Sequence, residues 1–225
     1  MPEFVRISHD IRPEDPGWPD SPKKFDYRQY DSIADGDPAN TFNLELFNHF
    51  GSHLDAPAHF NPDGIPISKV PMDRFVYERP ALIEVPKDDR ELVLREELEA
   101  HAQTIRECDL LMIRSGWQRF RASEPERYAA EGPGVAADAC EYLMQFPNLK
   151  AIALDWISLA AYRRPEEGQQ AHRVLCGVDR PGRYVIIVED IDLGRLPDSP
   201  NRVYAVPLFP SGVDSSPCTV FAEVE

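Results

Sequence analysis

The chain has 225 residues, 42% of them hydrophobic, which is typical of one domain with a substantial core. Its 24 Lys and Arg against 39 Asp and Glu give a formal net charge of −15, and such a surface repels nucleic acids and anionic membranes. The sequence has no apolar run of membrane-spanning length, no leader-like start and no CxxC pair. We therefore expect a single cytoplasmic domain over residues 1–225.

The first informative segment, His49 to Phe60, contains three of the six histidines and one aspartate. A glycine and a proline within it exclude a continuous helix, so the segment is predicted to be extended and to lead into a loop. On a strand, His49, His53 and Asp55 share one face, whereas His59 lies beyond the proline, beside the metal instead of on it. Nitrogen and oxygen ligands without thiolate suit Zn, Mn or Fe(II) and leave a position for water. The segment therefore predicts a hydrolytic metal site.

Further along the chain, helical spacing of apolar residues predicts helices over Arg95–Ile105 and Val135–Phe146. Short apolar runs rich in β-branched residues predict buried strands. These runs are Ala81–Val85, Leu110–Ile113, Ala151–Leu154, Tyr184–Val188 and Val203–Val206. Because strands outnumber helices and many connections contain proline, we expect an α/β domain with a mixed sheet or barrel-like core, not a doubly wound parallel sheet.

A metal site on one loop usually needs ligands from elsewhere in the chain. His172 is the only unassigned histidine of the carboxyl-terminal half, and it follows the polar stretch Arg163–Gln170, which we interpret as a loop. Glu189 ends the predicted strand Tyr184–Val188, a usual place for an active-site carboxylate. The alternative for Glu189 is an acid at a strand end that faces water.

Residues 49–60 resemble the motif H-x-G-T-H-x-D-x-P-x-H-F of the cyclase-like metal-dependent hydrolases, with Ser52 in place of threonine. This family includes bacterial kynurenine formamidase and isatin hydrolase. The resemblance extends to five other segments, Ile7–Ile11, Trp18–Asp20, Ile113–Trp117, Leu154–Ser158 and Gly212–Pro217.

The resemblance implies a mixed-sheet swivelling β/β/α domain, assembled as a homodimer or a higher homo-oligomer. It also implies two divalent metal ions per chain, zinc first and manganese as the alternative. His59 would be the catalytic general acid and base, and Trp18 would contact an aromatic substrate. The implied metal ligands are His49, His53, Asp55, His172 and Glu189, with Asp55 and Glu189 bridging the two ions.

The function that the resemblance implies is hydrolysis of the amide C–N bond of a small molecule. The first hypothesis is an arylformamidase of tryptophan catabolism that acts on N-formylkynurenine. Metal-activated hydroxide would attack the carbonyl, and His59 would hand a proton to the departing amine. Two alternatives stay open: a cyclic amide hydrolase of the isatin type, whose relatives tend to carry glutamine at the position of Glu189, and a non-catalytic metal or small-molecule binder. Trp18, Phe50 and Phe60 are candidates for an apolar slot that holds the substrate.

Overall fold

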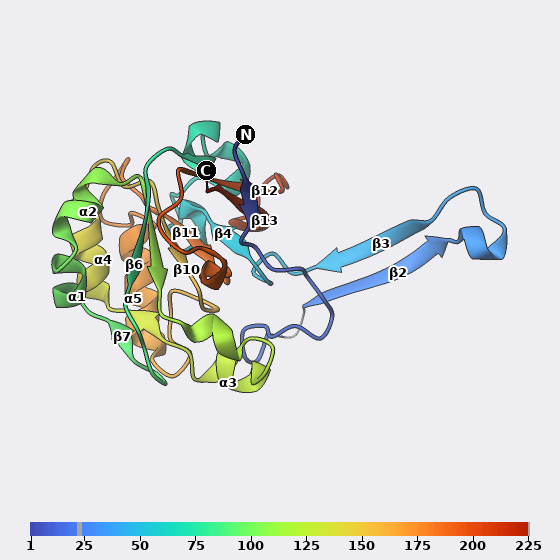
Figure 1. The fold of residues 1–225 in the computed structure, drawn as a ribbon, viewed down its shortest axis with the longest axis horizontal. Helices are drawn as coiled ribbons and strands as arrows, with labels where there is room; N and C mark the ends of the chain where they lie inside the picture. The colour runs from blue at the N-terminus through green and yellow to red at the C-terminus, as the bar shows by residue number, and fades with distance from the viewer. Residues whose placement is uncertain (22–23, 225) are drawn as a thin grey trace.

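The computed structural model describes residues 1–21 and 24–224. A nine-stranded mixed sheet forms its centre (Figure 1), in the order β5-β12-β13-β4-β11-β10-β8-β6, with β1 on β13. Its parallel half consists of β6 (Pro80–Glu84), β8 (Leu110–Arg114), β10 (Ala151–Leu154) and β11 (Ile186–Glu189).

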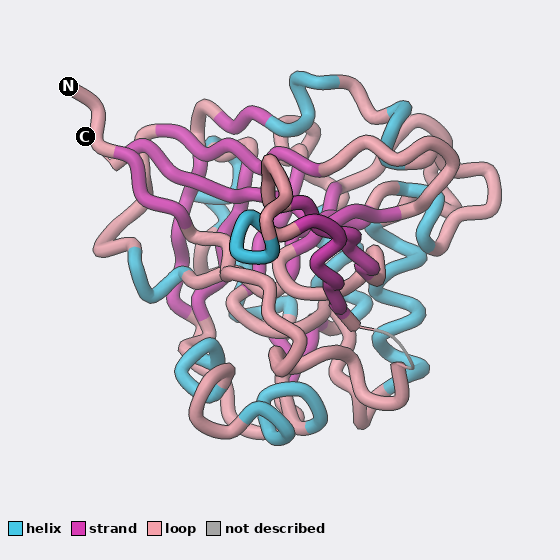
Figure 2. Tube along the Cα trace, turned by 90° about the vertical axis from the view of Figure 1, so that its right-hand side faces the viewer, coloured by secondary structure: helices cyan, strands magenta, loops and turns pink. Residues whose placement is uncertain are grey.

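The other half of the sheet is antiparallel and is organised by one long strand, β13 (Ser215–Glu223). The first part of β13 pairs with β4 (His53–Asp55), and its remainder pairs with β12 (Arg202–Pro207). Further pairing adds β1 (Phe4–Arg6) to β13 and β5 (Val76–Tyr77) to β12. Because β13 belongs to both parts, the sheet curls back on itself (Figure 2), and the predicted mixed, barrel-like α/β core is confirmed.

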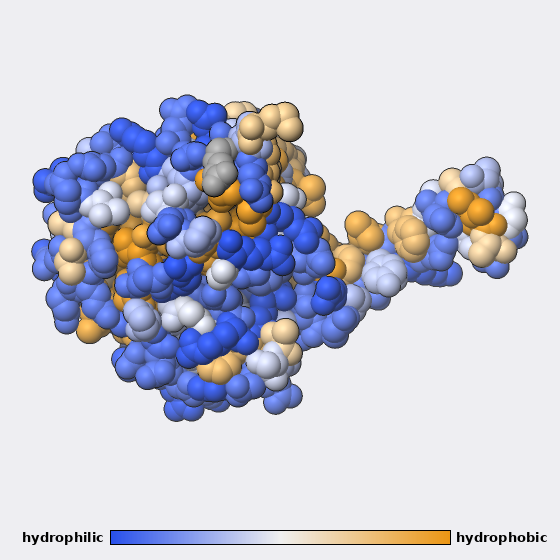
Figure 3. Space-filling model, in the orientation of Figure 1, coloured by the Kyte–Doolittle hydropathy of each residue, from blue (hydrophilic) through white to orange (hydrophobic). Residues whose placement is uncertain are grey.

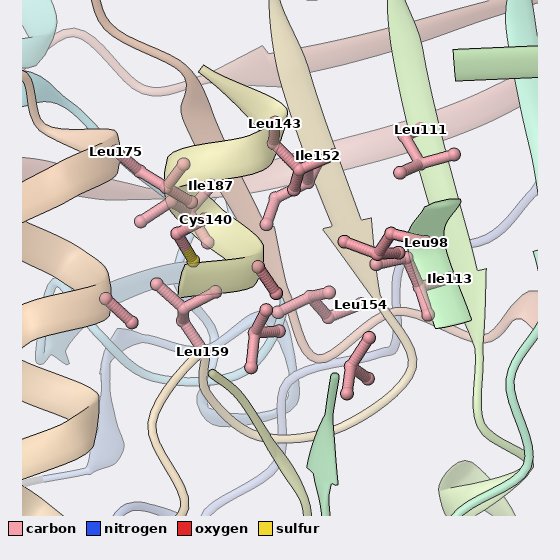
Figure 4. Close-up of a cluster of buried hydrophobic side chains, with 14 of the residues drawn as sticks. Leu98, Leu111, Ile113, Cys140, Leu143, Ile152, Leu154, Leu159, Leu175 and Ile187 are labelled. Atoms are coloured by element: carbon pink, nitrogen blue, oxygen red, sulfur yellow. The ribbon is translucent and has the colours of Figure 1, made fainter. Parts of the chain in front are cut away.

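Alternate residues of the central strands face two separate apolar layers. On β10, for example, Ile152 and Leu154 face the helices, whereas Ala151 and Ala153 face the curled half of the sheet. Figure 4 shows the helix-side layer, in which Leu143 and Leu175 lie over the strand residues. Strands buried on both faces are continuous apolar runs, which explains why the sequence predicted them well.

Five helices contribute to the helix-side layer, and two helix predictions need correction. The helices are α1 (Arg95–Glu99), α2 (Ala102–Glu107), α3 (Pro125–Ala130), α4 (Ala137–Leu143) and α5 (Pro165–Leu175). The predicted helix 95–105 is therefore two short helices. The predicted helix 135–146 is shorter at both ends, because Val135 pairs in β9 (Gly134–Val135) with β7 (Leu92–Val93).

The polar stretch before His172 was predicted to be a loop, and this prediction is wrong. In the structure the stretch forms the first half of α5. Pro165 occupies the first turn, where the missing N–H costs nothing, and Glu166 and Glu167 lie at the positive end of the helix dipole. Gly168 lets α5 pack closely against the segment that contains Ala160, because a Cβ at position 168 would lie 2.3 Å from the Cβ of Ala160. Helix geometry therefore positions His172.

A two-stranded arm that the sequence did not predict projects from this body (Figure 1). It consists of β2 (Phe25–Asp31) and β3 (Thr41–Leu46), which pair with each other and with no other strand of the described chain. None of the helices in the described residues is both long and apolar enough to cross a membrane.

Leu143 provides a test of the helix-side layer. Its side chain is fully buried under the sheet, so Leu143→Ala leaves a cavity and should lower the free energy of unfolding by about 2–5 kcal/mol. Leu94, which is 39% exposed, is the matched control, and Leu94→Ala should cost about 0.5 kcal/mol or less. Urea denaturation of both variants measures the difference, and equal costs would contradict the packing described here.

Candidate metal centre

The short strand β4 places two of the predicted ligands at the centre of the sheet. It lies between β11 and β13, and its register sets His53 directly opposite Glu189. His53 and Asp55 project from the same face because they are two residues apart, while Leu54 projects into the apolar layer on the other side. Strand parity therefore works as predicted for His53 and Asp55. His49 lies in the turn before β4, not on a strand, and His59 ends the 3-10 turn Pro57–His59.

Each of the four histidines near this strand has one ring nitrogen fixed by an acceptor. His53 Nδ1 donates to the Gly51 carbonyl at 2.8 Å, and His172 Nδ1 donates to the Gly168 carbonyl at 2.7 Å. One oxygen of Asp214 accepts from His49 Nε2 at 3.0 Å and from His59 Nδ1 at 2.7 Å. Such second contacts fix the tautomer of a ligating histidine.

In the neutral form of each ring the other nitrogen carries a lone pair, and these four nitrogens face the carboxylates. His49 Nδ1 lies 3.0 Å from Asp55 Oδ1, and His59 Nε2 lies 3.8 Å from Asp55 Oδ2. His53 Nε2 lies 3.1 Å from Glu189 Oε2, and His172 Nε2 lies 3.7 Å from Glu189 Oε1. Acceptors that face acceptors repel one another unless a proton or a cation lies between them.

The donor set fits a divalent cation. His53 Nε2 and both carboxylate oxygens of Asp55 are buried and make no hydrogen bond within the described part of the chain. Ligand atoms of His49, Asp55 and His59, and separately of His53, Asp55 and Glu189, lie within 4.8 Å of one another. Imidazole nitrogen with carboxylate oxygen is the donor set of Zn and Mn sites. The structure thus brings all five predicted ligands and His59 together.

Without a metal, the same contacts hold protons on His49 and His53. Burial by itself would lower the pKa of His49, but the charge of nearby Asp55 and the hydrogen bond with Asp214 outweigh it and raise the pKa to about 10. The pKa of His53 is also raised, because contacts with Glu189 and Asp55 outweigh its burial. A cation must therefore displace protons to bind.

The four histidines and Glu189 line a pocket of about 600 Å³, a size that suits a small aromatic molecule. Trp18 lines the pocket and meets the ring of Tyr162 edge to face at 5.6 Å between centroids. Phe60 also lines it and stacks on His172 at 4.6 Å. Phe50 does not lie among the described lining residues, because it is buried with its ring against Gly17.

The sequence did not single out Asp214, which holds two of the histidines. Its segment belongs to the family resemblance, but nothing in its spacing connects it with residues 155 or more positions away. The charges and hydrogen bonds of His49 and His59 hold the pKa of Asp214 well below its usual range, although burial opposes this.

A second unpredicted aspartate, Asp190, follows Glu189 directly. Its backbone is left-handed, with φ at +53°, and Arg121 donates to its carboxylate at 2.9 Å. Tyr128 donates its hydroxyl proton to the same carboxylate at 2.6 Å. These contacts of buried Asp190 hold the end of β11, where Glu189 lies. Glu189 itself accepts hydrogen bonds from the Ser158 hydroxyl and the Leu159 N–H.

Comparisons with known proteins agree with this architecture. Residues 5–161 match a sequence model of the family described as "Putative cyclase". Cyclase-like protein 1 of Arabidopsis thaliana is 30% identical over 218 residues, which cover 94% of this chain and 81% of that protein.

Solved structures show the same fold. Isatin hydrolase A from Labrenzia aggregata, solved with benzyl benzoate, superposes with a TM-score of 0.85 at 20% identity, over 99% of this chain and 94% of that one. A protein described as a predicted metal-dependent hydrolase, from Bacillus stearothermophilus, gives a TM-score of 0.75 at 22% identity, over 99% and 98% of the two chains.

Metal binding should release protons and strengthen as pH rises. In the metal-free chain the pKa of His49, about 10 instead of 6.5, keeps this ring charged at pH 7, and a ligand must be neutral. Apparent affinity for Zn²⁺ is therefore expected to increase between pH 6.5 and 10. Calorimetry at pH 7 in buffers of different ionisation enthalpy counts the protons. His49→Ala should reduce the count while His101→Ala, outside the site, leaves it unchanged; binding without proton release would refute this account.

Proposed function

The chain belongs to the cyclase family, and we propose that it is a metal-dependent hydrolase that cleaves the amide C–N bond of a small aromatic molecule. The observation that carries this proposal is the convergence of four imidazole rings on Asp55 and Glu189 beside a pocket lined by aromatic residues. Any histidine metal site needs second contacts of this kind, so the pocket beside the histidines is what favours a hydrolase over a non-catalytic binder.

The residues that would hold metal are the five that the sequence identified. We propose that these residues, His49, His53, Asp55, His172 and Glu189, would hold two divalent ions, zinc or manganese. Bound there, the ions would supply Lewis acidity for the carbonyl and lower the pKa of a coordinated water. Buried Asp55 and Glu189 offset their charge.

His59 is proposed as the general acid and base. Asp214 accepts from its Nδ1, so Nε2 is the atom that exchanges protons in the pocket. Nε2 can take a proton from the attacking water and deliver it to the departing nitrogen, while the Asp214 carboxylate stabilises the charged ring in between. The His59 side chain is 22% exposed, whereas that of His53 is 4% exposed, which suits contact with substrate.

For the substrate, we propose an N-formyl aryl amine of the N-formylkynurenine type. Trp18, Phe47 and Phe60 offer faces for an aryl ring. Asp20, at the same pocket, carries a carboxylate that accepts from Tyr162 at 2.5 Å and is placed to receive an ammonium group. A substrate with an amino group would use this carboxylate.

A neutral cyclic amide such as isatin is the second candidate. The described residues that line the pocket include no lysine or arginine, so charge recognition of a substrate carboxylate is missing from this part of the wall. The solved isatin hydrolase shares the fold, and an uncharged lactam would need only the aromatic faces and the metal centre.

Replacing His59 should separate proton transfer from metal binding. His59→Ala is expected to retain about two divalent ions per chain but to lose about 10²–10⁴ in kcat, the usual cost of a missing acid–base group. His53→Ala should lose both metal and activity, since it removes a buried ligand. Elemental analysis and steady-state kinetics measure the two effects. Loss of an ion from His59→Ala would make His59 a ligand and remove the proposed proton pathway.

Asp20 distinguishes the two substrate candidates. With N-formylkynurenine, Asp20→Asn should raise KM by about 10-fold or more, because a charge-assisted hydrogen bond to the ammonium is weakened. With isatin, the same variant should keep its KM. Kinetics on zinc- or manganese-loaded protein with both compounds give the answer, and activity on isatin alone would favour the cyclic amide.

A further inference from the structure

Two carboxylates at the end of β11 lie in different surroundings. Asp190 follows Glu189 directly, and both side chains are almost fully buried. Glu189 lines the pocket of the candidate metal centre, whereas Asp190 is bound by Arg121, which lines a second pocket of about 290 Å³. No described residue lines both pockets. Arg121 therefore acts on this strand end from outside the metal centre.

The second pocket is polar and lies on the side of the body that carries β1 and α3. Figure 3 shows a predominantly hydrophilic surface between these two elements. Among the arginines that line the pocket, Arg6 and Arg195 are about half exposed and pair with acids at its rim. The Arg121 side chain is only 9% exposed. Arg121 is therefore the arginine that extends from this pocket into the fold.

Arg121 binds both oxygens of the Asp190 carboxylate. Its Nε donates to Oδ1 at 2.9 Å, and its Nη2 donates to Oδ2 at 2.9 Å. Such a two-pronged contact fixes the orientation of a carboxylate as well as its charge. The His9 ring lies 3.9 Å from the same carboxylate, but burial lowers the pKa of His9, so this ring is neutral at pH 7. Arg121 therefore supplies the positive charge that buried Asp190 needs.

The backbone of Asp190 is held in an unfavourable conformation. Its φ is +53°, and a residue with a side chain keeps a left-handed backbone only where its surroundings impose it. The Asp190 N–H donates to the Trp156 carbonyl at 2.9 Å, and its carboxylate accepts from Arg121 and Tyr128. These contacts set the path of the chain at the end of β11. The direction of Glu189 depends on that path.

Asp190 is also connected to the strand that carries His53. The Asp190 carbonyl accepts a hydrogen bond from the hydroxyl of Ser52, the residue before His53. His53 lies directly opposite Glu189 in the sheet, with Nε2 at 3.1 Å from Glu189 Oε2. A shift of Asp190 would therefore displace both side chains.

We propose that Arg121 is a positioning residue of the metal centre. Through Asp190 it holds Glu189 and His53 in the arrangement that binds metal, although no hydrogen bond or ion pair joins it to either within the described chain. Loss of contacts that support metal ligands from outside typically weakens metal binding about 10–100-fold. An ion pair that only stabilises the fold would leave metal affinity unchanged. The inference rests on the metal centre of the proposed function but not on its amide chemistry.

Cobalt binding tests this role without any measurement of hydrolysis. Co²⁺ accepts the same nitrogen and oxygen donors as zinc, and its visible absorption bands report the geometry of its ligands. Arg121→Gln should weaken Co²⁺ binding about 10–100-fold and change the position or intensity of these bands. Arg195→Gln is the matched control, since it makes the same substitution at the rim of the same pocket, where Arg195 pairs with Asp192. This control should keep the affinity and the spectrum of the unaltered chain.

Arg121→Lys covers the case in which Arg121→Gln does not fold, which circular dichroism detects. Lysine keeps the charge but cannot bind both oxygens in one plane, so we expect a folded chain with an altered Co²⁺ spectrum and about 10-fold weaker binding. A folded Arg121→Gln with the affinity and spectrum of the unaltered chain would overturn the proposal, and if that variant does not fold, the same result for Arg121→Lys would do so. An unaltered chain that binds no Co²⁺ would instead refute the metal centre itself, and this inference with it. The two failures are therefore distinguishable.

Discussion

The main constraint on this structure is that it must hold mutually repelling buried acceptors together around Asp55. Two carboxylates and four imidazole lone pairs face one another where water has little access, and such an arrangement is unfavourable unless protons or cations occupy it. Everything that surrounds the site keeps these groups in place against that repulsion. The folded chain therefore favours binding of protons or cations between these groups.

The sheet provides the necessary rigidity through the position of β4. This strand has three residues, yet it is hydrogen-bonded on both sides, by β11 and by β13. Behind it, Asp190 in left-handed conformation is bound to Arg121 and Tyr128, an arrangement that a buried carboxylate needs to remain charged. Ligands on short, doubly paired strands are held more precisely than ligands on loops.

The predictable parts of the chain were those with a local physical signal. Buried strands such as Ala151–Leu154 are apolar on both faces, so a simple run of residues revealed them. The start of α5 was misread as a loop because its exposed turn is polar, and only packing of Gly168 against Ala160 reveals it as a helix close to the sheet. The arm was missed because its faces become distinct only after β2 and β3 are paired.

The sequence by itself determined which side chains form the core of the candidate site, because His49, His53, Asp55 and His59 lie within eleven residues and two of them share a strand face. It also identified His172 and Glu189, through the end of a strand and a family resemblance. Only the tertiary structure decided which nitrogen of each ring faces inward, because Gly51, Gly168 and Asp214 accept from the opposite nitrogen. Gly51 and Gly168 lie only two and four residues from their histidines, but the folded backbone is what aims their carbonyls at the rings. Asp214 lies 155 and 165 positions from its two partners, and a hydrogen bond between segments so far apart leaves no periodic trace in a sequence.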